Sequence, residues 1–239
     1  MFKAIIFDVD GTLSETEEVH RRAFNKAFEM KELPWHWDLP AYRKLLRVSG
    51  GKERIRHFME ANDPQRLATA KVDGWILDLH RAKTNFYTQM IEAGEARLRP
   101  GVREFIIEAT TRDIRLAIAT TTSMPNVEAL LHSAFGREGV TLFEVICAGD
   151  SVPNKKPAPD IFLLALEMLG LGASDCVAIE DSRNGLLSAY NAGIAAIVTP
   201  SIFTDDQSFD EAALVTKDMQ GISLETIFVS IRGNMRAIC

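Results

Sequence analysis

The sequence predicts an α/β protein in which a doubly wound parallel sheet, a Rossmann-like core, carries an inserted α-helical cap domain. Two observations predict this fold. Short, largely apolar runs recur along the chain with amphipathic helical stretches between them, and residues 15–97 show helical periodicity with almost no strand signal. Strands buried on both faces of a parallel sheet have such apolar runs, and their alternation with helices is typical of a doubly wound fold.

Five apolar runs are expected to form the strands of the sheet. The first, residues 4–7, is entirely apolar and ends abruptly at a polar turn that begins with Asp8. A short run without any polar residue is typical of a strand that is covered on both faces. The later strands are expected at residues 115–119, 144–147, 176–179 and 194–198.

The cap domain is expected at residues 15–97, and the core domain at residues 1–14 and 98–239. The interval far exceeds an ordinary connection between a strand and a helix, so it needs a fold of its own. Pro100 and Gly101 mark its second boundary, because this pair of residues breaks a helix. Trp35 and Trp37 are expected to lie in a turn between cap helices and to be buried against them.

Composition and charge exclude several classes of partner. The chain has 239 residues, of which 46% are hydrophobic and 25% charged, as in ordinary globular proteins. Its 33 acidic and 27 basic residues give a formal charge of -6, which argues against a nucleic-acid binder. No apolar stretch approaches the roughly 18 residues of a membrane span. We therefore expect a cytoplasmic protein, a monomer or weak dimer, that binds neither nucleic acid nor membrane.

The cysteines fit the same location. Cys147, Cys176 and Cys239 are too few and too scattered for a disulfide framework. Two of them lie in apolar runs that resemble strands. They are expected to be buried thiols in a reducing compartment.

Two carboxylates follow the first expected strand. Asp8 and Asp10 come directly after residues 4–7, and the period-two geometry of an extended chain points both side chains the same way. Ligands of open α/β sheets bind at this carboxyl end of the strands. Two carboxylates this close repel each other unless a cation or a shared proton offsets them, so a Mg²⁺ site is a natural reason for the pair. The alternative is that both side chains cap nearby backbone amides.

Further polar groups follow three other expected strands. Glu180 and Asp181 end one strand, Thr120 ends another, and Lys156 lies after a third. Because parallel strands end at one edge of the sheet, these groups are expected to converge on Asp8. Taken singly, the aspartate and the threonine could be helix caps, and a lysine is normally solvated. Together they supply a carboxylate, a cation site, hydroxyl donors and an ammonium group, which are the parts that phosphoryl transfer requires.

The order of these residues resembles the haloacid dehalogenase superfamily over essentially the whole chain. An aspartate at position 10 resembles its phosphatase and phosphomutase branches, so dehalogenation is not expected. A helical cap between the first and second motifs resembles the subgroup that contains β-phosphoglucomutase and phosphoglycolate phosphatase. The motifs that carry the resemblance are Asp8-x-Asp10-Gly11-Thr12, Thr120, Lys156 and Glu180-Asp181.

Within that subgroup, five segments resemble the CbbY family, which removes phosphate from xylulose 1,5-bisphosphate, an inhibitory by-product of Rubisco. The resemblance implies a phosphatase that converts xylulose 1,5-bisphosphate to xylulose 5-phosphate. The segments are residues 7–13, 15–24, 49–55, 80–83 and 119–123.

The resemblance also implies a role for each core residue. Asp8 would attack phosphorus and form an aspartyl-phosphate, while Asp10 would first protonate the departing sugar oxygen and then activate the hydrolytic water. The implied catalytic residues are Asp8, Asp10, Thr120 and Lys156. The implied ligands of a Mg²⁺ cofactor are Asp8, the backbone carbonyl of Asp10 and Asp181, and Glu180 is implied to support this metal site through water or Lys156.

Substrate selection is expected from the cap. Glycines at 50–51 let the backbone approach a ligand, and Lys52 with Arg54 would face a second anionic group, as a bisphosphate requires. Glu17 and His20 lie three residues apart on one helix face, where they could contact sugar hydroxyls. An ordinary flexible turn and a surface histidine are the alternatives. The expected substrate contacts are Thr12, Glu17, His20, Tyr42, Ser49, Gly50, Gly51, Lys52, Arg54, Thr121, Thr122 and Asn126.

Other functions stay open at this stage. The core motifs barely separate a phosphatase from a phosphomutase, which would return the phosphoryl group to a rebound sugar bisphosphate. A phosphoglycolate phosphatase is a second related alternative. A different class is a phospho-switch binding module, in which an aspartate accepts phosphate and alters a protein interface. The size of the cap argues against the switch.

Overall fold

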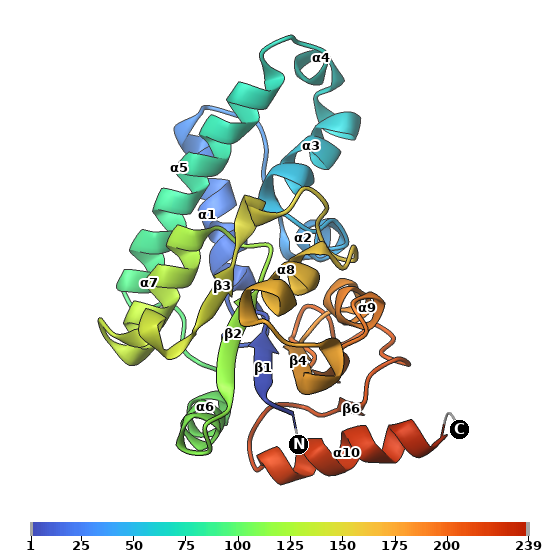
Figure 1. The fold of residues 1–239 in the computed structure, drawn as a ribbon. Helices are drawn as coiled ribbons and strands as arrows, with labels where there is room; N and C mark the ends of the chain where they lie inside the picture. Colours follow the sequence, from blue (N-terminus) through green and yellow to red (C-terminus); the bar gives the residue numbers. More distant parts are fainter. Residues whose placement is uncertain (1, 238–239) are drawn as a thin grey trace.

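The computed structural model describes residues 2–237 and contains the expected sheet (Figure 1). Its strands lie in the order β3-β2-β1-β4-β5-β6, so the first strand of the chain lies in the interior of the sheet. All neighbouring strands are parallel. The strands are β1 Ala4–Phe7, β2 Arg115–Ala119, β3 Val145–Cys147, β4 Cys176–Glu180, β5 Ala195–Val198 and β6 Leu214–Val215.

Helices cover both faces of the sheet. Successive side chains of a strand point to opposite faces, so the apolar side chains on each face are buried against helices. The core helices are α6 Val102–Thr111, α7 Met124–Phe135, α8 Asp160–Leu169, α9 Arg183–Asn191 and α10 Leu224–Ala237, with short 3₁₀ turns η1 Gly139–Leu142, η2 Gly149–Ser151 and η3 Ala173–Asp175. In β1, Ile5 and Phe7 pack with α6, α7 and α10, whereas Ala4 and Ile6 pack with α8 and α9. All four side chains are fully buried, which accounts for the unbroken apolar run in the sequence.

The five strands expected from the sequence are present, with bounds that differ from the expected ones by at most one residue. The sixth strand, β6, was not expected. It has only two residues, and Val215 is 48% exposed at the edge of the sheet. A strand this short shows neither an alternating pattern nor a buried apolar run.

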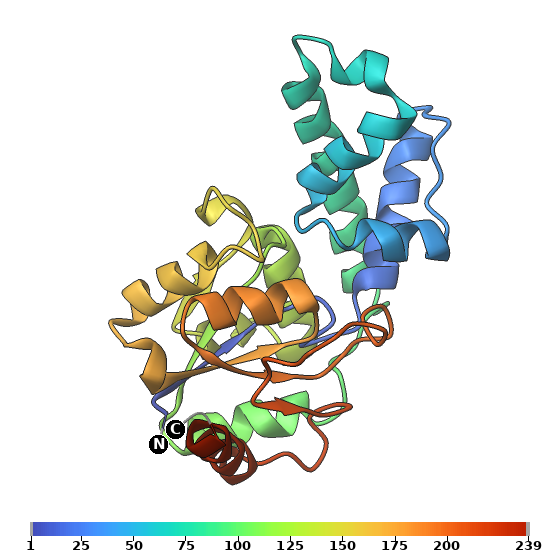
Figure 2. The ribbon, with the colours of Figure 1, turned by 90° about the vertical axis from the view of Figure 1, so that its right-hand side faces the viewer.

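The insertion between β1 and β2 is helical and stands to one side of the sheet (Figure 2). It has its own apolar core, in which Trp37 is fully buried and Trp35 nearly so, as expected from the sequence. The boundaries of the cap at residues 15 and 97 stay a prediction. The helices of the insertion are α1 Glu17–Met30, α2 Leu39–Leu45, α3 Gly51–Asn62, α4 Pro64–Leu67 and α5 Val72–Glu92.

The two linkers that join the insertion to the sheet lie side by side. Ser14 and Leu98 form an antiparallel bridge, and Ser14 Oγ donates to the backbone oxygen of Arg97 at 2.6 Å. Arg99 then ties both linkers to the core, because its buried guanidinium bonds the carbonyl of Gly11 and lies 3.1 Å from Glu15. The insertion is therefore attached through one paired hinge.

Two further expectations concern the whole chain. Cys147 and Cys176 are buried free thiols, as expected, whereas Cys239 lies outside the described residues. Within residues 2–237, no helix combines the length and the apolar character that crossing a membrane requires.

Candidate active site

Three carboxylates meet at the carboxyl ends of β1 and β4. Asp8 is the first residue after β1, and its backbone N–H donates to the carbonyl of Ile179 at 3.0 Å, which aligns the ends of these neighbouring strands. Glu180 ends β4 and Asp181 follows it. One oxygen from each of Asp8, Glu180 and Asp181 lies within 4.8 Å of the others, and all three residues are buried.

A buried lysine offsets part of this negative charge. Lys156 Nζ donates to Asp8 Oδ1 at 2.7 Å and to Glu180 Oε1 at 2.6 Å. Its third partner is the backbone oxygen of Ala119 at 2.8 Å, so the three donors of the ammonium group have three acceptors. Burial alone would lower the pKa of Lys156, but the charges of Asp8 and Glu180 raise it above its ordinary value. The ammonium group therefore stays protonated at neutral pH.

The remaining negative charge suits a bound cation. Burial raises the pKa of Asp8, and it raises the pKa of Glu180 to about 8, in both cases against the opposing charge of Lys156. Burial and the repulsion of the two other carboxylates raise the pKa of Asp181 well above its ordinary value. A divalent cation would relieve this repulsion, and carboxylate oxygens are the ligands that a hard cation prefers. The donor set thus fits a metal ion.

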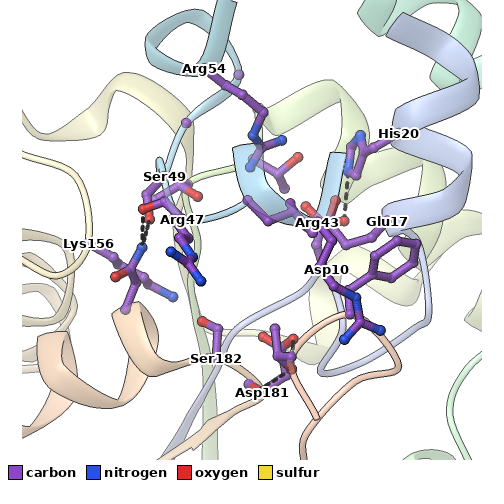
Figure 3. Close-up of a pocket in the computed structure, with 18 of the residues that line it drawn as sticks. Asp10, Glu17, His20, Arg43, Arg47, Ser49, Arg54, Lys156, Asp181 and Ser182 are labelled. Atoms are coloured by element: carbon purple, nitrogen blue, oxygen red, sulfur yellow. Dashed lines mark hydrogen bonds and ion pairs between the residues drawn. The ribbon is translucent and has the colours of Figure 1, made fainter. Parts of the chain in front are cut away.

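Asp10 is separated from this cluster although it lies only two residues from Asp8. Thr16 Oγ1 donates to Asp10 Oδ1 at 2.5 Å, and His20 Nε2 lies 2.9 Å from the same oxygen. Thr16 immediately precedes α1 and His20 lies within it, so both partners come from the beginning of the insertion. Figure 3 shows His20 directed toward Asp10. The Asp10 carboxylate is therefore held from the cap side of the cavity.

A second buried lysine lies behind His20. Lys83, from α5, hydrogen bonds His20 Nδ1, and the His20 ring stacks on Tyr87 with 4.1 Å between ring centroids. Burial lowers the pKa of Lys83 to about 7 and also lowers the pKa of His20. Burial would raise the pKa of Asp10, but the charge and hydrogen bond of His20 hold it below its usual range. At neutral pH, Asp10 is ionised and Lys83 is close to its titration midpoint.

The variant Lys83→Met is expected to be more stable than the parent protein at pH 6, and this gain is expected to shrink by about 3 kcal/mol by pH 9. The pKa of Lys83 is about 7 in the folded protein and ordinary in the unfolded chain, so between these values the unfolded chain binds more protons. Stability of the parent therefore rises with pH relative to the variant. Urea unfolding of both proteins at pH 6 and pH 9 measures the difference, and a gain that is equal at both values would contradict it.

A cavity of about 770 Å³ opens between the sheet and the insertion, and Figure 3 shows side chains directed into it from both sides. Asp8, Asp10, Thr120, Lys156 and Asp181 line it from the core. The expected substrate contacts that line it are Glu17, His20, Ser49, Gly50, Gly51, Arg54, Thr121, Thr122 and Asn126.

Three of the expected substrate contacts do not line this cavity. Thr12 is buried, and Tyr42 is fully buried with its hydroxyl donating to Glu17 Oε2 at 2.7 Å, so Tyr42 orients a residue that does face the cavity. Lys52 lines a smaller neighbouring cavity, where it forms an ion pair with Asp150 of the core. Of the expected metal ligands, Glu180 lies beneath the cavity wall and bonds Lys156.

The sequence did not single out the basic residues of the cavity rim. Arg43 pairs with Asp205 at 2.8 Å and Arg183 pairs with Glu211. Lys44 and Arg47 also line the cavity, and within residues 2–237 neither side chain forms an ion pair or a hydrogen bond. For Arg43, Lys44 and Arg47, the available signal is that three basic residues fall within residues 43–47, shortly before the Ser-Gly-Gly turn at residues 49–51.

Comparison with known proteins places this site in a family. The pattern of the haloacid dehalogenase-like hydrolases matches residues 2–193. Protein CbbY of Rhodobacter capsulatus is 48% identical over 225 residues, which cover 94% of this chain and 97% of that protein. The chain belongs to the CbbY family of these hydrolases. The resemblance that the sequence motifs indicated is thereby confirmed.

Two solved structures of CbbY from Rhodobacter sphaeroides share the fold of this CbbY-family hydrolase. One, in complex with phosphate, is 45% identical and superposes with a TM-score of 0.89, covering 95% of this chain and 100% of that chain. The other is a variant in complex with xylulose 1,5-bisphosphate, 44% identical, with a TM-score of 0.87 and coverage of 95% and 99%. The α/β fold with a helical insertion is thus shared with both CbbY structures.

Proposed function

We propose that the chain is a Mg²⁺-dependent phosphatase that hydrolyses xylulose 1,5-bisphosphate to xylulose 5-phosphate through an aspartyl-phosphate. One observation carries the proposal: a single cavity has a buried cluster of carboxylates and lysine on the sheet side, and on the cap side it has Lys44 and Arg47, whose side chains have no partner among the described residues. A bisphosphate presents one phosphate to each. Xylulose 1,5-bisphosphate is the compound bound to the CbbY variant that is 44% identical to this chain.

In the proposed reaction, the Asp8 oxygen that is not bonded to Lys156 attacks phosphorus, and the bond from phosphorus to the sugar oxygen breaks. Water then attacks the same phosphorus, phosphate leaves, and the Asp8 carboxylate is restored. The Thr120 hydroxyl accepts from the backbone N–H of Thr122 at 3.2 Å and can itself donate to a phosphoryl oxygen, while Lys156 exchanges one of its three hydrogen bonds for another phosphoryl oxygen. Bound Mg²⁺, held by Asp8 and Asp181, would neutralise charge on these oxygens.

Asp10 handles the protons of both steps. It donates one to the departing sugar oxygen and later takes one from the attacking water. Because the pKa of Asp10 is held low, its carboxylate must be protonated before the first step. Lys83, with a pKa of about 7, hydrogen bonds His20, whose Nε2 lies 2.9 Å from Asp10, so the proton can arrive along this line of contacts.

The second phosphate of the substrate is expected at the cap side of the cavity. Arg54 donates to the backbone oxygens of Leu45 and Val48, so its guanidinium is partly engaged within the insertion. In the part of the chain that the structure describes, the Lys44 and Arg47 side chains have no such partners, and Figure 3 shows the Arg47 side chain in the cavity. A guanidinium binds a phosphate through two parallel hydrogen bonds, so Arg47 is the stronger candidate of the two.

Replacing Arg47 with methionine is expected to raise KM for xylulose 1,5-bisphosphate by about 10–100-fold with little change in kcat, because a charge-assisted contact to a non-reacting phosphate is lost. Steady-state hydrolysis of p-nitrophenyl phosphate, which has one phosphate, should be unaffected. Arg56→Met is the matched control, since Arg56 lies on α3 of the same insertion and pairs with the exposed Asp73. Equal losses for both substrates would place the second phosphate elsewhere.

The substrate is tested by measuring release of inorganic phosphate from xylulose 1,5-bisphosphate, ribulose 1,5-bisphosphate and phosphoglycolate. The metal is tested by treating the enzyme with EDTA, which should abolish phosphate release, and by adding Mg²⁺, which should restore it. Xylulose 1,5-bisphosphate should have the highest kcat/KM. A much higher kcat/KM for phosphoglycolate would overturn xylulose 1,5-bisphosphate as the substrate but would leave the proposed reaction mechanism intact. Isomerisation of β-glucose 1-phosphate without phosphate release would instead favour a phosphomutase. A single phosphorylation of the protein without turnover would favour the phospho-switch binding module.

A further inference from the structure

The segment 199–206, which follows β5, lies between the carboxylate cluster and the insertion. Its buried residue Thr204 contacts Asp181 twice: Oγ1 donates to the backbone oxygen at 2.7 Å and lies 3.3 Å from the carboxylate oxygen Oδ2. The backbone N–H of Ser201 donates to Thr204 Oγ1 at 2.9 Å, which fixes the hydroxyl within the segment. Asp181 is therefore held by a residue that is 23 positions away in the chain.

Asp181 has little freedom to move on its other side. Gly11 adopts φ +83°, and a Cβ at this position would lie 2.2 Å from Asp181 Oδ2 and 3.1 Å from Ser201 Cβ. Only glycine fits both this backbone conformation and this close approach. The Asp181 carboxylate is thus enclosed between the turn after β1 and the segment 199–206.

The same segment is also bound to the insertion. Phe203 packs edge-on against Tyr42, with 6.1 Å between ring centroids, and belongs to the apolar core of the insertion although it comes from the other part of the chain. Arg43, the next residue of α2, bonds the carbonyl of Ile202 and pairs with Asp205 at 2.8 Å. Any movement of α2 relative to the sheet therefore acts on residues next to Thr204.

The beginning of the segment is anchored to the hinge. Arg99 donates to the backbone oxygens of Thr199 at 2.5 Å and Pro200 at 2.8 Å, and the same guanidinium bonds Gly11 and Glu15 of the first linker. The segment is consequently fixed at one end by the hinge, bound to α2 in its middle, and in contact with Asp181 through Thr204.

We infer that the segment 199–206 couples the position of the insertion to the metal site, with Thr204 as a positioning residue for Asp181. The inference rests on the proposed function, because it requires that Asp181 binds the metal. Groups that orient a metal ligand without touching the metal contribute strongly to metal affinity. Packed interiors transmit displacements between discrete arrangements, so movement of the insertion over a bound phosphate would shift Thr204, change how it holds Asp181 and tighten the metal.

Binding of Mn²⁺ followed by electron paramagnetic resonance tests the positioning role without measuring activity. Thr204→Val keeps the shape of the side chain but removes the hydroxyl, and it should raise the Kd for Mn²⁺ by about tenfold. Thr204→Ser keeps the hydroxyl and should bind nearly as tightly as the parent, whereas a purely structural role predicts equal behaviour of the two variants. A valine variant whose Kd is within twofold of the parent would overturn the inference.

The coupling itself is tested by repeating the titration with and without saturating inorganic phosphate. Phosphate should lower the Kd for Mn²⁺ in the parent protein, and Arg43→Met should reduce the size of this effect about threefold, because α2 then loses its bond to the segment 199–206. Arg56→Met, elsewhere on the insertion, is the control and should leave the tightening unchanged. Identical behaviour of these two variants would overturn the coupling. A parent protein that binds no Mn²⁺ would overturn the proposed metal and this inference with it.

Discussion

Replacing Asp8 with asparagine is expected to lower kcat for phosphate release by roughly 10⁴-fold or more, since the amide keeps the shape of the side chain but does not attack phosphorus. The variant should also fail to become labelled by a radioactive phosphate ester in a rapidly quenched reaction. It is expected to fold, because the change removes one of three crowded carboxylates and leaves Lys156 paired with Glu180 at 2.6 Å.

The matched control is Asp73→Asn, the same chemical change at a residue that is 87% exposed on α5. Its kcat should equal that of the parent. An Asp8→Asn protein with the melting behaviour of the parent and a kcat within tenfold of it would rule out Asp8 as the nucleophile. Loss of activity together with loss of the folded state would be uninformative, so circular dichroism accompanies the kinetics.

Replacing Lys156 with methionine is expected to affect both stability and catalysis. The change leaves Asp8 and Glu180 buried without their shared cation, which should cost about 3–5 kcal/mol of unfolding free energy, and it removes a phosphate donor, which should lower kcat about 10²–10³-fold. The pKa of Glu180 is about 8 even with the lysine present. Since the folded variant binds more protons than its unfolded chain, its stability should fall as pH rises from about 5 to 9.

Two further variants separate these effects. Lys155→Met alters the neighbouring lysine, whose ammonium bonds the carbonyl of Gly149 and the exposed Asp150, and it should leave kcat nearly unchanged. Adding Glu180→Gln to Lys156→Met removes one uncompensated charge and should restore part of the stability but not the activity. Urea unfolding and phosphate release measure both. A Lys156→Met protein as stable at pH 9 as the parent would contradict the burial argument.

The core of the site could be predicted from the sequence because topology does most of the positioning. Residues that directly follow parallel strands must reach the same edge of the sheet, so Asp8, Thr120 and Asp181 line one cavity despite their distance in sequence. Lys156 follows the same rule with a longer connection. Strand ends therefore carry positional information that a single sequence reveals.

The cap side could not be predicted as well, because the direction of a helical side chain depends on packing between helices. Lys52 follows the paired glycines and was expected in the main cavity, yet it pairs with Asp150 beside it. Lys83 carries a charge that suggests a surface position, but it lies four residues from each of the buried Leu79 and Tyr87, on the inward stripe of α5. The four-residue spacing was the available signal that Lys83 is buried. It could not be used with the sequence alone, because the sequence does not specify how α5 packs against the other helices.

The paired hinge has a consequence for how substrate preference changes during evolution. Because Ser14 and Leu98 are neighbours, the helical insertion enters and leaves the core at one place and can be exchanged as a module without a break in the sheet. Chemistry and substrate choice can then diversify separately. Phe203 limits this freedom, since it is rooted in the core yet completes the apolar interior of the insertion. A transplanted insertion must therefore provide an apolar pocket for the Phe203 ring, because the new enzyme would otherwise contain a cavity at the contact between the insertion and the core.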